Sequence, residues 1–96
     1  MWTLVIPLLA TTSSATLRHL FGSAATYYAT HVGGPLIGDR DLSLPFPKAG
    51  QEWLLPVVYG SGQDETAAQS EAERLRQAFQ IERLDVTVEL RYEAAV

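Results

Sequence analysis

The sequence predicts an α+β sandwich in which strands and helices follow one another in the order βαββαβ. Three observations support this fold class. Residues 2–9 and 53–59 form apolar runs typical of strands that are covered on both faces. Residues 84–92 alternate strictly between apolar and polar side chains, as in a strand with one buried and one solvent-exposed face. Residues 64–80 instead repeat their apolar side chains at helical spacing.

The first helix is expected directly after the strand at residues 2–9. Thr11, Thr12 and Ser13 offer side-chain oxygens that can accept hydrogen bonds from the free backbone N–H groups of a helix start. Apolar side chains then recur at helical spacing, at Leu17, Leu20, Phe21 and Ala24. Gly22 and Ser23 are expected to end this helix.

Residues 26–32 have two possible structures. They are rich in β-branched and aromatic side chains, which favours a strand. The alternative extends the first helix to His31 and makes Gly22 an interior glycine, at a cost of about 0.5–1 kcal/mol relative to alanine. The strand is the preferred interpretation, and the choice between strand and helix for residues 26–31 stays open.

The C-terminal half supplies the remaining elements. Asp64 and Glu65 lie in the first turn of the second helix, where they can accept hydrogen bonds from its free N–H groups. The apolar face of this helix consists of residues at steps of four, three and four, namely Ala68, Ala72, Leu75 and Phe79. Residues 84–92 form the last strand.

With right-handed crossovers, this order of elements gives a ferredoxin-like sandwich. It has a four-stranded antiparallel sheet ordered 4-1-3-2, both helices on one face, and a long connection at residues 33–51 between the second and third strands. Pro7 and Pro56 lie in the two strands that this order makes central, yet proline cannot donate to a ladder. The topology therefore requires both prolines to lie at bulges or strand ends.

The long connection contains an unusual number of apolar side chains. Leu42, Leu44 and Phe46 alternate with Ser43 and prolines, so an extended backbone would place all three on one side. We expect them to form an arm that docks on the chain's own sheet or on a neighbouring subunit.

Composition limits the class of function. The 96 residues form one domain, 1–96, with a net charge of −4 from seven basic and eleven acidic side chains. This balance argues against nucleic acid as a partner, because such binding depends on Lys and Arg. No segment approaches the ~20 apolar residues that span a bilayer, and the chain has no cysteine. The expected protein is soluble and cytoplasmic, without a membrane partner.

No motif indicates a cofactor or a metal. The segment GSGQDE at residues 60–65 is a glycine-rich link between a strand and a helix, but its acids would repel a phosphate. Asp39, Asp41 and Ser43 match the first ligands of a calcium loop, whereas Leu44 and Gly50 stand where that loop needs glycine and glutamate.

Candidate site residues come from the predicted second strand and the long connection. His31 and Tyr27 share one face of that strand, where Arg40 or Asp41 of the connection could join them. An imidazole in such a group could do acid–base work, which makes His31 the candidate catalytic residue. The predicted binding residues are Tyr27, His31, Arg40, Leu42, Leu44 and Phe46. The other histidine, His19, lies off the apolar stripe of the first helix and is expected to be exposed.

From Glu52 onward, the segment EWLLPVVYGSGQDETAAQSEAERLRQAFQIERLDVTVELRY resembles the second half of short uncharacterised bacterial and phage proteins with a ferredoxin-like layout. The resemblance covers about half of the chain and consists of its pattern of elements. It implies the same fold and identifies no site residue.

Two functions are consistent with these features. The first is a non-enzymatic oligomeric binding module, a homodimer that takes a protein or small-molecule ligand on its open sheet face and long loop. It follows from apolar side chains that two short helices cannot all cover, among them Val5, Leu9 and Leu54. The alternative is a small cofactor-independent enzyme of the dimeric ferredoxin-like barrel type, with His31 in a cavity.

Overall fold

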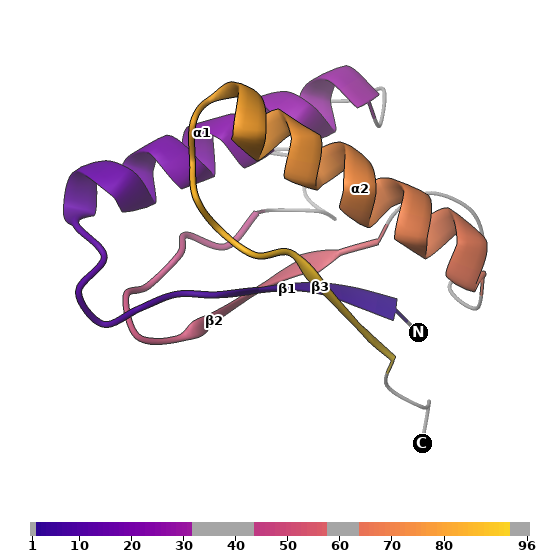
Figure 1. Ribbon diagram of the computed structural model, residues 1–96, viewed down its shortest axis with the longest axis horizontal. Coiled ribbons are helices and arrows are strands. Elements are labelled where there is room, and N and C mark those ends of the chain that lie inside the picture. The colour runs from indigo at the N-terminus through magenta and orange to yellow at the C-terminus, as the bar shows by residue number, and fades with distance from the viewer. Residues whose placement is uncertain (1, 32–43, 58–63, 93–96) are drawn as a thin grey trace.

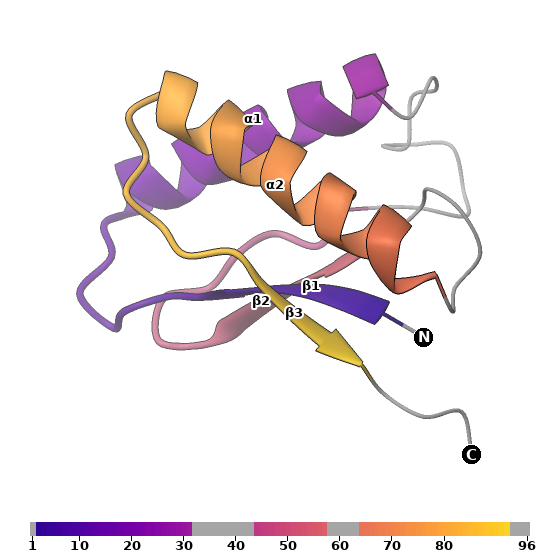
Figure 2. The ribbon, with the colours of Figure 1, turned by 45° about the vertical axis from the view of Figure 1, so that its right-hand side comes forward.

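The computed structural model describes residues 2–31, 44–57 and 64–92, and Figure 1 shows their arrangement. The elements in chain order are β1 (Trp2–Pro7), α1 (Ser14–His31), β2 (Glu52–Pro56), α2 (Glu65–Ile81) and β3 (Glu89–Tyr92). Both helices lie on the same side of the strands in Figures 1 and 2. The protein is thus an α+β fold with a helical layer and a sheet layer.

The described strands form a three-stranded antiparallel sheet in the order β2-β1-β3. Pro7 is the last residue of β1 and lies opposite Glu52, beyond the point at which the β1–β3 ladder ends at Val5. Pro56 is the last residue of β2. Both prolines therefore lie at strand ends, where a missing N–H costs the ladder little.

The predicted four-stranded sheet is wrong, because residues 26–31 are not a strand. They form the last part of α1, as the alternative interpretation allowed. The helical phase places Leu20, Ala24 and Tyr28 in the core, at intervals of four residues. Burial of the two rings of Tyr27 and Tyr28 outweighs both the strand propensity of this segment and the cost of an interior glycine.

α2 confirms the prediction for residues 64–80. Asp64 is its N-cap, and the side-chain Oδ1 of Asp64 accepts a hydrogen bond of 3.2 Å from the backbone N–H of Ala67. The buried face contains the four expected residues and also Glu71, which is completely buried. The helix ends at a turn in which Arg83 adopts a left-handed φ of 59°.

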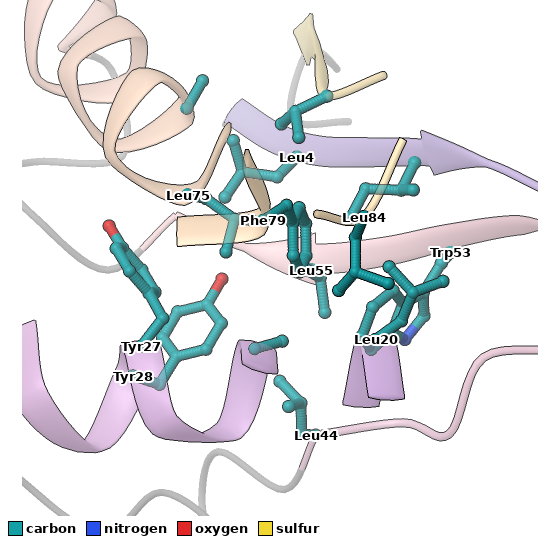
Figure 3. Packing of buried hydrophobic residues seen from close by; sticks show 14 of the residues in the cluster. Leu4, Leu20, Tyr27, Tyr28, Leu44, Trp53, Leu55, Leu75, Phe79 and Leu84 are labelled. Carbon is teal, nitrogen blue, oxygen red and sulfur yellow. The ribbon is translucent and has the colours of Figure 1, made fainter. Parts of the chain in front are cut away.

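The core lies between the helices and the sheet and draws on every element (Figure 3). Tyr28 from α1, Phe79 from α2 and Leu55 from β2 point into it. Leu44, from the segment that leads into β2, is also buried there. The indole Nε1 of Trp53 donates a 2.8 Å hydrogen bond to the carbonyl of Pro45, which fixes this segment against β2.

The last predicted strand is shorter than its pattern suggests. Leu84 and Val88 are buried, and Asp85 and Thr87 between them are exposed, so the expected alternation is present. Ladder pairing to β1 is confined to Glu89–Tyr92.

Candidate functional site

A groove lies between α1 and α2, with a volume of about 620 Å³. One row of its lining residues repeats every four positions along α1, so that it follows a single helix face. The lining consists of Arg18, His19, Gly22, Ser23, Thr26, Tyr27 and Thr30 from α1, and Ala78, Ile81 and Glu82 from the end of α2. At 1.5 Å per residue, the stretch of α1 from Arg18 to Thr30 is about 18 Å long.

The groove is open because α1 presents small side chains to it. Gly22, Ser23 and Thr26 fill little of the space beside α2. A Cβ added at Gly22 would meet no heavy atom within 4 Å. The same glycine that lowers the helix propensity of α1 therefore leaves room between the two helices.

Charge is unevenly distributed along the groove. At the Arg18 end, His19 Nε2 lies 3.0 Å from Glu82 Oε1 and links the two helices. Arg18 itself has no hydrogen bond or ion pair with any residue that the structure describes. Ile81 forms an apolar wall and is 78% exposed. The groove thus has one end where Arg18 lies near the His19–Glu82 pair, hydroxyl groups along α1 and an apolar side at Ile81.

A polar cluster is buried beside the groove. The hydroxyl of Tyr27 donates to the backbone carbonyl of Glu71 at 3.4 Å, and the hydroxyl of Tyr28 donates to the carbonyl of Pro56 at 2.8 Å. The two rings meet edge to face, with centroids 5.2 Å apart. Burial raises the pKa of Tyr28 far above its usual range, and the charges of Glu71 and Tyr27 add to the effect. The Tyr28 hydroxyl therefore stays protonated and has a structural role.

The open face of the sheet is less apolar than the sequence suggested. Val5 points away from the helices and is nevertheless fully buried. Its neighbours across the sheet are Leu54 and Glu89. Arg91 of β3 forms a bidentate ion pair with Glu52 of β2, at 2.9 and 2.6 Å, and this pair crosses β1. The hydrogen bond from Arg91 also lowers the pKa of Glu52.

On the described part of the open face, Leu54 is the large apolar side chain that a partner could contact. It is 47% exposed. Val5, which the sequence predicted to need a partner to cover it, is already buried within the single chain.

The structure does not bring the predicted site residues together. Tyr27 is buried in α1, Leu44 is in the core, and Phe46 is 51% exposed with its ring 5.2 Å from that of Phe21. His31 is the last residue of α1, and its side chain lies outside the described part, as do Arg40 and Leu42.

Sequence reasoning missed the groove because it ended the first helix at Gly22. Once α1 extends to His31, the spacing of Arg18, Gly22, Thr26 and Thr30 in steps of four defines one helix face with small and polar side chains. That spacing is the signal that could have identified the groove. The side chain of His19 is about half exposed, in agreement with the prediction that this residue lies at the surface.

Within residues 2–31, 44–57 and 64–92, no three His, Asp or Glu side chains are grouped so that they could hold a metal ion. In the same ranges, neither helix has the length and apolarity needed to cross a membrane. No protein-family model, curated protein or solved structure matches this chain.

Proposed function

We propose that this protein is a non-catalytic binding module whose ligand site is the groove between α1 and α2. The observation that supports the proposal is the groove itself. Its volume of about 620 Å³ lies within the range of pockets that hold small organic ligands. Its lining combines an apolar wall with a few polar groups, which is the usual composition of such pockets.

The chemistry of the lining favours a small organic anion with an apolar body. Arg18 provides a positive charge that has no partner among the described residues. An acidic group of the ligand would bind there, while the body of the ligand would lie along Ala78 and Ile81. The hydroxyls of Thr26 and Thr30 can donate to or accept from polar substituents.

The test uses 8-anilinonaphthalene-1-sulfonate as the probe, because it has an aromatic body and one sulfonate. Fluorescence titration of the folded protein is expected to give saturable binding at one site. Gly22→Leu fills the groove and should abolish the binding, whereas Arg18→Gln should weaken it. Thr66→Leu introduces the same leucine side chain at an exposed position in the first turn of α2 and should leave the affinity unchanged.

A fourth variant, Leu54→Asp, tests the open sheet face as the binding surface. Loss of binding in Leu54→Asp, with retention in Gly22→Leu, would move the site to the sheet and contradict the proposal. Equal loss in Gly22→Leu and Thr66→Leu would show that added surface bulk, and not filling of the groove, is responsible.

A further inference from the structure

The two outer strands of the described sheet differ in how their free edges are protected. β2 ends in Pro56, which has no N–H to donate. The carbonyl of Pro56 accepts a hydrogen bond from the hydroxyl of Tyr28. β3 contains no proline, and β1 is its single neighbour among the strands that the structure describes. A free edge has unpaired N–H and C=O groups, which can pair with a strand of another chain.

We propose that the edge of β3 pairs with β3 of a second copy, antiparallel and centred on Leu90. The pairing is symmetric, so each chain contributes the same residues. It depends on the fold alone and is independent of the groove between the helices.

Charge complementarity selects this register. With Leu90 opposite Leu90 of the second copy, Glu89 of each chain lies opposite Arg91 of the other, which would then be shared between that glutamate and Glu52 of its own chain. Opposite charges on directly paired residues stabilise a sheet. Glu89 is exposed and has no ion-pair partner in the described part of its own chain. A shift of the partner by one residue would place Glu89 opposite Tyr92 and would lose both ion pairs.

A hollow beside the edge supports the same register. It has a volume of about 270 Å³ and lies between α2 and β3. Its lining comprises Gln69, Ala72, Glu73 and Arg76 of α2 together with Leu90. Leu90 is paired with Leu4 and therefore points to the helical side of the sheet. Leu90 of the second copy would point to that side too and would partly fill the hollow.

Arg76 holds the two walls of the hollow together. Its Nη2 donates a 2.8 Å hydrogen bond to the carbonyl of Val88, and its guanidinium also pairs with Glu73. This hydrogen bond connects α2 to the residue that precedes β3, so the hollow is already formed in the single chain.

The dimer should be weak, because strands of four residues form few hydrogen bonds. Stable complexes usually bury about 1,200–2,000 Å² of surface, and this edge offers less. We therefore expect association that depends strongly on protein concentration.

The test is a charge exchange followed by sedimentation over a wide range of protein concentration. The wild-type protein should pass from monomer to dimer as its concentration rises. Glu89→Arg and Arg91→Glu each place like charges opposite one another and should weaken self-association by roughly tenfold or more. An equimolar mixture of the two variants should associate again, because each chain then faces opposite charges.

Thermal melts of each variant establish that it is folded, which matters for Arg91→Glu because Arg91 also pairs with Glu52. The double variant Glu89→Arg/Arg91→Glu keeps the net charge and the complementarity and should dimerise. A monomeric wild type at every concentration would overturn the proposal, as would a mixture that fails to associate. Loss of the dimer in Leu54→Asp, with no effect of Glu89→Arg, would assign the contact to the open sheet face instead.

Discussion

α1 and α2 have nearly the same length, 18 and 17 residues, but they are helical for different reasons. α2 has an N-cap, an acidic first turn and one continuous buried face, all of which are local properties of its sequence. α1 has a glycine near its middle and β-branched and aromatic residues in its second half. Local sequence is therefore enough to make α2 a helix in many folds, whereas the second half of α1 is helical because of the residues that it packs against.

The largest expected effect is a loss of stability when either helix loses a buried leucine. Leu20 and Leu75 are both completely buried. Leu20→Ala and Leu75→Ala should each lower the free energy of unfolding by about 2–5 kcal/mol, because each opens a cavity against the sheet.

Denaturant melts measure both values, and Ser70→Ala on the exposed face of α2 is the control that should change little. A small effect of Leu20→Ala would mean that α1 is held less firmly than α2, which would change the comparison.

The next effect concerns the second half of α1. Tyr28→Phe removes the hydroxyl that donates to Pro56 and leaves that carbonyl without this partner. We expect a loss of about 1–3 kcal/mol. Tyr92→Phe removes a hydroxyl from a residue that is 45% exposed and should cost less. Equal losses would show that the tie between α1 and β2 contributes no special stability.

The same substitution changes the response to alkaline pH. The pKa of Tyr28 is raised in the folded state above its ordinary value of 10.0, so the folded protein keeps a proton that the unfolded chain releases. The stability due to the neutral hydroxyl is complete below pH 10 and is lost as the pH rises above it. Melts of wild type from pH 8 to 11 should therefore show a steeper decline than melts of Tyr28→Phe.

The helix caps provide a smaller effect that should be equal in the two helices. Ser13 Oγ accepts a 3.1 Å hydrogen bond from the N–H of Thr16. Asp64 Oδ1 likewise accepts a hydrogen bond from the N–H of Ala67. Ser13→Ala and Asp64→Ala should each cost about 1 kcal/mol in thermal melts. The comparison predicts this equality, because the start of α1 is as locally determined as the start of α2. A cost confined to Asp64→Ala would contradict it.

The smallest expected effect is a gain in stability. Gly22→Ala places a methyl group in open space and removes the entropic cost of an interior glycine. We expect the free energy of unfolding to rise by about 0.5–1 kcal/mol. A decrease in the melting temperature would mean that Gly22 needs a conformation that alanine cannot adopt, as at a helix end.

Much of the fold followed from local patterns. The strand at β1, the whole of α2 and the cap at Asp64 were predictable, since each depends on spacing within a few residues. The fourth strand was predicted wrongly because residues 26–31 have strand propensity but are buried as a helix. The predicted site failed with it, since Tyr27 was assigned to a sheet face and instead lies in a helix, beside a groove that the strand interpretation had excluded.

By itself, the sequence determined the start of each helix, the apolar face of α2 and the alternation of residues 84–92. These features arise from side chains that interact with their own backbone or repeat with a fixed period. The tertiary structure decided the length of α1, the burial of Val5, the Glu52–Arg91 pair across β1 and the existence of the groove. Each of these depends on residues far apart in the chain, and the free energy of packing them together exceeds the small differences in local propensity that sequence patterns measure.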